Sequence, residues 1–164
     1  MESQVNVLFL CPHNSARSIL AEALLNHMGQ SRFKGYSAGS HPRVNQQPHP
    51  LALRVLSEAG IATAGLHSKN WNDFALDAAP RMDLIITVCD NAAGEVCPTW
   101  PGRPATAHWG YPDPSEGDAP NAEKLLAFQH TLQSIEHKLQ WLISLPNHEV
   151  RAAVFATAAA TLIQ

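Results

Sequence analysis

The sequence predicts a single α/β domain built on a four-stranded parallel sheet with helices on both faces. Three observations support this prediction. Apolar segments of strand length alternate with helical segments, one of these apolar segments is typical of a fully buried strand, and no linker divides the 164 residues. Strands that alternate with helices favour a parallel sheet with right-handed crossovers. We expect the strand order 2-1-3-4, in which the direction of winding reverses between strands 1 and 3.

Hydrophobic patterns and the residues that interrupt them locate the elements. Strands are expected over residues 5–10, 33–38, 84–88 and 105–109. The third of these segments is a continuous run of apolar and β-branched residues, as in a strand that is buried on both faces. Helical patterns begin at Ile19, Pro50 and Leu125 and are expected to end at Gly29, Gly60 and Pro146.

Composition places the chain among globular proteins and excludes several classes of function. Hydrophobic residues make up 45% and charged residues 15% of the sequence, which is typical of a folded domain. The formal net charge of -3 argues against broad binding to nucleic acids or to anionic membranes. Any anion that the protein recognises must therefore be bound by a local group of residues.

The termini and the cysteines favour a cytoplasmic protein. The first residues lack the basic segment of a signal peptide, and the longest apolar tract, residues 152–163, is too short to span a bilayer. The three cysteines include no Cys-x-x-Cys pair, unlike a secreted disulfide framework. Residues 1–145 are expected to form the catalytic domain and residues 146–164 a tail whose role the sequence does not indicate.

The residues that follow the first strand have the pattern of an anion-binding loop. Arg17 lies in the first turn of the helix, where a cation opposes the helix dipole. An oxyanion in the loop removes this conflict, because free N–H groups and the dipole both attract it and Arg17 can donate two forked hydrogen bonds. We expect the oxyanion to be bound by Arg17 together with the rest of the loop: Pro12, His13, Asn14, Ser15, Ala16 and Ser18.

The same loop should make Cys11 a nucleophile. A thiol at a helix N-terminus beside an arginine ionises well below the usual pKa of about 8.5, so the thiolate should predominate at neutral pH. Ser15 and Ser18 are placed to donate hydrogen bonds to the charged sulfur. Asn14 suits a backbone position with positive φ. The alternative is a buried strand-end cysteine beside an unrelated arginine.

Asp113 is expected at the same edge of the sheet, because it follows the fourth strand by a few residues. Its neighbours Pro112 and Pro114 should keep this loop stiff. Near a thiolate and an oxyanion the pKa of the carboxyl should rise, which would make Asp113 a general acid. The alternative is a solvated aspartate in a turn.

Cys89 and Cys97 form a second pair of thiols. Cys89 ends the third strand and should therefore face the edge where Cys11 lies, and the polar loop between the two cysteines could open at low cost. Two alternatives remain. The cysteines could be buried apart from each other, or they could bind a metal with His108, although this spacing lacks the clustering of most metal ligands.

Three segments together resemble one known family: the loop from Cys11 to Ser18, the pair Cys89/Cys97, and the His-Trp-Gly-Tyr-Pro-Asp-Pro sequence of residues 108–114. They look like the thioredoxin-coupled arsenate reductases of the low-molecular-weight protein tyrosine phosphatase superfamily. The resemblance covers residues 5–145 and implies the phosphatase-like fold. Reductases and phosphatases share the loop, whereas the cysteine pair and the His-Trp-Gly segment are more specific for reductases.

The resemblance implies a role for each site residue. Cys11 would form an adduct with arsenic, Arg17 and the loop amides would hold the oxyanion, and Asp113 would protonate the leaving oxygen. Cys89 would attack the adduct, which releases arsenite and leaves a disulfide with Cys11. Cys97 would take over this disulfide and present it to thioredoxin, or else to glutaredoxin or a small thiol. No cofactor and no resident metal centre are expected.

The chain departs from the family pattern around the loop. His13 stands where glycine is common, and Ala16 stands where eukaryotic-type phosphatases have a second cysteine. Ser115 and Glu116 replace the paired aromatic residues that bind phosphotyrosine, which weakens the phosphatase interpretation.

A second departure concerns a cation site. Some relatives bind potassium near the loop, and Asn14, Glu22 and Ser37 match its ligands. Asn70 stands where an aspartate is expected, with Lys69 beside it, so the resemblance leaves potassium dependence open.

An arsenate reductase with residual phosphatase activity is the favoured function. The alternative is a low-molecular-weight phosphatase that hydrolyses phosphate monoesters through a phosphocysteine at Cys11, since it would share the loop and the acid without needing Cys89 or Cys97. A third hypothesis is a redox-sensing or metal-binding module, which would need neither Asp113 nor an intact anion loop.

Overall fold

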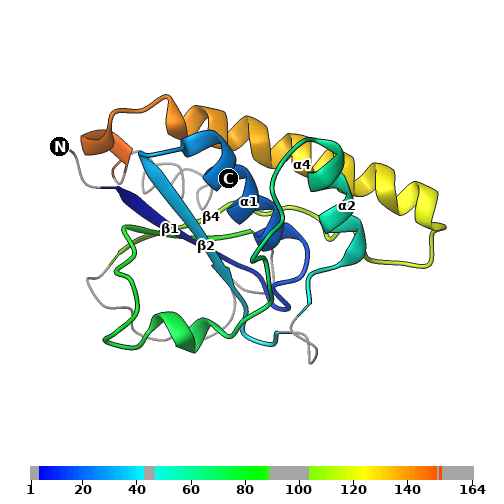
Figure 1. The fold of residues 1–164 in the computed structure, drawn as a ribbon, viewed down its shortest axis with the longest axis horizontal. Coiled ribbons are helices and arrows are strands. Elements are labelled where there is room, and N and C mark those ends of the chain that lie inside the picture. The colour runs from blue at the N-terminus through cyan, green and yellow to red at the C-terminus, as the bar shows by residue number, and fades with distance from the viewer. Residues whose placement is uncertain (1–3, 43–46, 89–103, 151, 153–164) are drawn as a thin grey trace.

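The computed structural model describes residues 4–42, 47–88, 104–150 and 152. Strands and helices alternate along the chain (Figure 1). The strands are β1 (Val5–Leu10), β2 (Phe33–Ala38), β3 (Leu84–Thr87) and β4 (Ala105–His108). The helices are α1 (Arg17–Gly29), α2 (Pro50–Glu58), the 3-10 helix η1 (Trp71–Phe74) and α4 (Asn121–Ile143).

The four strands form one parallel sheet in the order β2-β1-β3-β4, which confirms the predicted topology. Leu10 pairs with Ala38 of β2 and with Thr87 of β3, and Thr87 pairs with His108 of β4. All four strands therefore end at the same edge of the sheet. Cys11 follows β1 directly at this edge, as expected for a ligand site outside the carboxyl ends of parallel strands.

The sheet separates two apolar layers. On one face, Val7 and Phe9 of β1 belong to the main core, which also contains the buried sides of α1, α2 and α4. On the other face, Leu8 and Leu10 pack with Trp71 of η1. Figure 1 shows α4 lying along the first face, with η1 on the other side of the sheet. In the described part of the chain, a short 3-10 helix and irregular segments cover this second face.

α1 ends at Gly29, as predicted, but the residue in the left-handed conformation is the next one, Gln30, which has a φ of 48°. Gly29 is also required for packing, because a Cβ at this position would lie only 2.7 Å from the Cβ of Phe33. The absence of a side chain thus lets β2 begin directly against the end of α1.

The chain that follows α4 packs back onto the domain. The Arg32 guanidinium donates hydrogen bonds to the carbonyls of Ile143 (2.8 Å) and Leu145 (2.6 Å) and to Oδ1 of Asn147 (2.7 Å). Val150 is fully buried in the main core. Most of the expected tail lies outside the described residues. None of the helices in the described ranges combines the length and apolar character needed to cross a membrane.

Candidate active site

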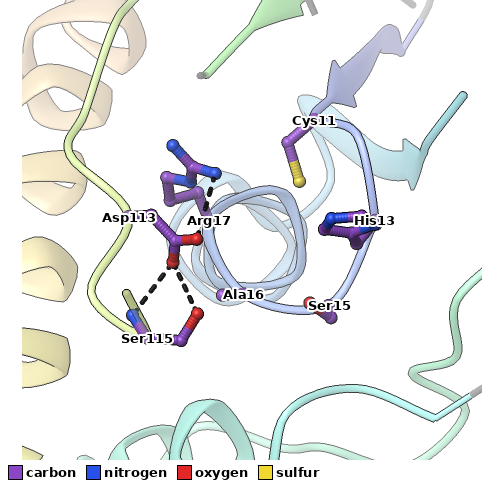
Figure 2. A pocket seen from close by; sticks show the side chains of 7 residues that line it. All are labelled: Cys11, His13, Ser15, Ala16, Arg17, Asp113 and Ser115. Carbon is purple, nitrogen blue, oxygen red and sulfur yellow. Dashed lines mark hydrogen bonds and ion pairs between the residues drawn. The ribbon is translucent and has the colours of Figure 1, made fainter. Parts of the chain in front are cut away.

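The sulfur of Cys11 faces a pocket of about 330 Å³ at the N-terminus of α1. Figure 2 shows Arg17 and Asp113 on one side of this pocket and His13 on the other. Ser15, Ala16 and Ser115 complete the lining. The fold therefore brings the aspartate after β4 to the loop after β1, as the sequence predicts.

In the loop, backbone carbonyls are bonded to other parts of the protein, whereas backbone N–H groups are left for a ligand. Three of its carbonyls accept hydrogen bonds from other segments: Pro12 from the N–H of His41 (2.7 Å), Asn14 from Oγ of Ser68 (2.6 Å) and Ser15 from the N–H of His49 (2.8 Å). Within the described ranges, the N–H groups of residues 13–17 have no protein acceptor. A run of free N–H groups at a helix N-terminus attracts an anion.

Gly39 holds the loop from behind. A Cβ at Gly39 would lie 2.5 Å from the carbonyl oxygen of Pro12 and 2.6 Å from that of Cys11. Gly39 also forms an isolated parallel bridge with Asn70, and its N–H donates to the carbonyl of Lys69 (2.9 Å). The loop is thus supported both by the end of β2 and by the segment around Lys69.

Asn14 has the predicted positive φ, with a value of 49°, and its fully buried side chain links two parts of the site. Its Oδ1 accepts a hydrogen bond from the N–H of Lys69 at 2.9 Å. This contact orients the amide, so that Nδ2 donates to Oγ of Ser18 at 2.8 Å.

Cys11 is 3% exposed, and its sulfur lies 2.9 Å from Oγ of Ser18. Because that Oγ already accepts from the Asn14 amide, the hydroxyl proton of Ser18 is available to the sulfur. A hydrogen bond to the charged form of a thiol favours the thiolate. The structure therefore supports the predicted role of Ser18 as a donor to Cys11 and places Ser15 in the pocket wall.

The terminal nitrogens of the Arg17 guanidinium contact Tyr111 and Asp113, whereas its Nε has no protein acceptor among the described residues. One terminal nitrogen donates to the carbonyl of Tyr111 at 2.9 Å, and the second lies 3.8 Å from a carboxylate oxygen of Asp113. The side chain is 12% exposed, and its buried Nε has no acceptor among the described residues. A buried donor without a partner is costly, and an oxyanion in the pocket would supply the missing acceptor.

The pKa of Asp113 does not follow the sequence-based expectation. Partial burial raises the pKa of this carboxyl, but the hydrogen bonds from Ser115 and the charges of Arg17 and His13 outweigh burial and lower it below its usual value. Ser115 donates through both its Oγ (2.7 Å) and its N–H (2.9 Å). Asp113 is thus a carboxylate at neutral pH, because its local partners stabilise the charged form.

The second thiol pair, Cys89 and Cys97, lies outside the described residues, so the disulfide relay stays a prediction. His108, the third residue of the alternative metal site, has its Nδ1 2.6 Å from Oγ1 of Thr87. In the part of the chain that the structure describes, no three His, Cys, Asp or Glu side chains are grouped as metal ligands.

Several residues that build the site are not among those predicted from the sequence. Ser115 holds Asp113, Tyr111 holds Arg17, and Gly39 and Ser68 hold the loop backbone. A serine two residues after an aspartate is a known turn pattern and could have indicated the first contact. The others depend on tertiary approach, for which the sequence carries no local signal.

Comparison with known proteins defines the class. Residues 6–154 match the family model described as low molecular weight phosphotyrosine protein phosphatase. The chain therefore belongs to this family, which confirms the superfamily resemblance of the loop motif.

Several relatives that are about 30% identical to this chain are arsenate reductases. An arsenate reductase of Bacillus subtilis is 31% identical over 140 residues, which cover 85% of this chain and 95% of the relative. The crystal structure of an arsenate reductase from Archaeoglobus fulgidus is 32% identical, with a TM-score of 0.66 over 85% of this chain and 99% of that one. A thioredoxin-dependent arsenate reductase of Corynebacterium glutamicum is also 32% identical, with a TM-score of 0.57, covering 86% and 65% of the two chains.

Proposed function

We propose that this protein is an arsenate reductase that works with three thiols, Cys11, Cys89 and Cys97. The observation that carries the proposal is the position of the Cys11 sulfur. It is hydrogen-bonded to Ser18 and faces a pocket that also contains Arg17. The arsenate reductases among the relatives support arsenate as the oxyanion.

In the first step, the Cys11 thiolate attacks arsenic. The free loop N–H groups and Nε of Arg17 hold the substrate oxygens. Arsenate that enters as the monoanion transfers one proton to Asp113, whose pKa rises when the anion lies beside it. Asp113 then returns this proton to the departing hydroxyl group, which leaves as water. The sulfur–arsenic bond replaces one arsenic–oxygen bond, and arsenic is still pentavalent.

In the second step, the Cys89 thiolate attacks the sulfur of Cys11. A sulfur–sulfur bond forms, and the electron pair of the sulfur–arsenic bond stays on arsenic, which leaves as arsenite after taking up protons from water. The two thiols have lost two electrons, and arsenic has gained them. Cys97 then attacks Cys89 and releases the Cys11 thiolate by ordinary thiol–disulfide exchange.

An external dithiol must reduce the resulting disulfide between Cys89 and Cys97. Thioredoxin is the reductant we propose, and the thioredoxin-dependent reductase among the structural relatives supports this choice. A reducing compartment such as the cytoplasm would keep all three thiols ready for the next turnover.

The decisive experiment measures arsenite release with and without thioredoxin and its reductase, for the wild type and for the three single cysteine-to-serine variants. We expect Cys11→Ser to abolish arsenite release and also the slow hydrolysis of an aryl phosphate. Cys89→Ser should abolish arsenite release but leave aryl phosphate hydrolysis intact, because hydrolysis needs no second thiol.

Cys97→Ser should complete a single turnover and then stop with a disulfide between Cys11 and Cys89, detectable by peptide mass spectrometry. Full arsenate turnover by Cys89→Ser would contradict the relay. If all variants except Cys11→Ser hydrolysed aryl phosphates rapidly, and the wild type released no arsenite, the protein would be a phosphatase instead.

A further inference from the structure

Behind the anion loop, oxygen atoms surround the ammonium group of Lys69. Its Nζ lies 2.9 Å from the carbonyl oxygen of Ser37, 3.5 Å from Oγ of Ser37, 3.5 Å from Oδ1 of Asn14 and 3.7 Å from Oε1 of Glu22. The side chains of Lys69 and Glu22 are only 15% and 16% exposed. This ion pair makes no contact with the pocket, and the proposed reaction does not use it.

The oxygens around Lys69 are arranged for a cation. A carbonyl oxygen and the amide oxygen of Asn14 can only accept hydrogen bonds. The hydroxyl of Ser37 donates its proton to the Glu22 carboxylate, so its lone pairs are available to the ammonium group. Oxygen ligands of this kind also suit hard metal cations. Potassium does not fit here, because Nζ of Lys69 already occupies the space between the three residues that match its ligands.

Burial shifts the pKa of both Glu22 and Lys69 toward the neutral form, and the opposite charge of each residue counteracts this shift in the other. Burial raises the pKa of Glu22, whereas the charge of Lys69, the Ser37 hydrogen bond and the charge of His67 lower it. Burial lowers the pKa of Lys69, whereas Glu22 and the charge of Asp73 raise it. Removing one partner alone would leave a buried charge that needs a new counter-ion.

A chain of hydrogen bonds connects Lys69 to the nucleophile. Both the N–H and Nζ of Lys69 donate to Oδ1 of Asn14, and the amide of Asn14 donates to Ser18. The Ser18 hydroxyl lies against the sulfur of Cys11. A positive charge at one end of such a chain polarises each bond and favours negative charge at the other end.

We propose that Lys69 is a built-in cation, a positioning residue that holds the loop through Asn14 and favours the thiolate of Cys11 without potassium or another monovalent ion. This inference rests on the proposed function only in naming arsenate reduction as the reaction of the Cys11 thiolate. Removing the lysine side chain should leave the oxygens of Ser37, Asn14 and Glu22 around an open space, which a monovalent cation could then occupy.

The test measures alkylation of Cys11 by iodoacetamide as a function of pH, with the Cys11 peptide quantified by mass spectrometry. This readout needs no turnover, so a failed reductase assay would not affect it. For Lys69→Ala in choline chloride, we expect the midpoint of the pH profile to rise by about one unit, which is a tenfold change in thiol ionisation. Potassium chloride at the same ionic strength should restore the midpoint, and it should not affect the wild type.

Two further variants complete the design. Lys34→Ala removes an exposed lysine from β2 and should behave as the wild type in both salts. The double variant K69M/E22Q fills the space with a neutral pair, so its midpoint should be raised in both salts, and it carries the test if Lys69→Ala does not fold. An unchanged midpoint of Lys69→Ala in choline chloride, or of K69M/E22Q in either salt, would overturn the proposal. So would a folded Lys69→Ala whose raised midpoint potassium does not lower.

Discussion

The hydroxyl oxygen of Ser18 lies 2.9 Å from the sulfur of Cys11, and the amide of Asn14 fixes the direction of this hydrogen bond by donating to the same oxygen. The serine therefore has its proton left for the sulfur. This arrangement depends on the positive φ of Asn14, which turns its side chain inward to contact Lys69 and Ser18. The loop geometry and the state of the nucleophile are thus determined together.

Ser18→Ala should make Cys11 a weaker nucleophile. Loss of the hydroxyl removes a hydrogen bond that favours the charged sulfur, so the pKa of the thiol rises. We expect the midpoint of Cys11 alkylation against pH to move up by about one unit. Ser134→Ala, which removes a hydroxyl bonded to the His130 carbonyl on the exposed side of α4, is the control. Identical profiles for Ser18→Ala and the wild type would show that the contact has no influence on the thiol.

Asp113→Asn should slow the first chemical step, because asparagine cannot return a proton to the leaving oxygen. Loss of a general acid typically lowers a rate about 10²- to 10³-fold. Single-turnover formation of the arsenic adduct in the Cys89→Ser background measures this step alone. Binding of phosphate as a competitor should not weaken, since the variant removes a negative charge from the pocket. A rate that stayed within threefold of the parent would assign the proton transfer to another group.

The lowered pKa of Asp113 also predicts how stability depends on pH. Its folded pKa lies below the unfolded value, so in the acid range the unfolded chain binds more protons at this residue. The contribution of Asp113 to the free energy of unfolding is therefore present above the unfolded pKa and is lost as pH falls through the folded pKa. In urea unfolding between pH 3 and 6, the free energy of unfolding of Asp113→Asn should depend less steeply on pH than that of the wild type. Asp118→Asn, at an exposed position, should keep the wild-type slope.

Gly39→Ala should distort the anion loop. The new Cβ would lie 2.5 Å from the carbonyl oxygen of Pro12 and 2.6 Å from that of Cys11, so the loop must move. We expect the free energy of unfolding to fall by about 1–3 kcal/mol. Phosphate bound in the loop should protect Cys11 of the wild type against alkylation, and Gly39→Ala should lose this protection. Gly117→Ala is the control, because its φ of +91° makes alanine strained there while the surrounding space is open. It should destabilise the protein but leave phosphate binding unchanged.

Arg32→Ala should detach the chain that follows α4. Three acceptors on residues 143–147 lose their charged donor, and we expect the free energy of unfolding to fall by about 2 kcal/mol. The alkylation profile of Cys11 should not change, since Arg32 is remote from the loop. Arg54→Ala removes the exposed ion pair with Glu58 and should cost less than about 0.5 kcal/mol. Equal losses for both arginine variants in urea unfolding would contradict a specific role for Arg32.

Local patterns were enough to predict most of the architecture. Apolar segments predicted β1 and β3 to within about one residue at each end, because burial on both faces of a parallel sheet leaves a continuous apolar run. The strand–loop–helix junction around Cys11 and the left-handed conformation of Asn14 were also predictable, because both depend on residues that are neighbours in the sequence. The helix end at Gly29 was predicted, but its packing role was not, because that role depends on Phe33, which packs against it from the next strand.

The sequence by itself determined the parallel α/β fold, the anion loop with Cys11 and Arg17, and the edge of the sheet where Asp113 would lie. Only the tertiary structure decided the ionisation of Asp113 and the surroundings of Lys69. The physical reason is that a pKa and an ion pair depend on the sum of burial, charges and hydrogen bonds contributed by several segments. That sum is defined only when the segments are packed together, so no spacing along the chain reveals its sign.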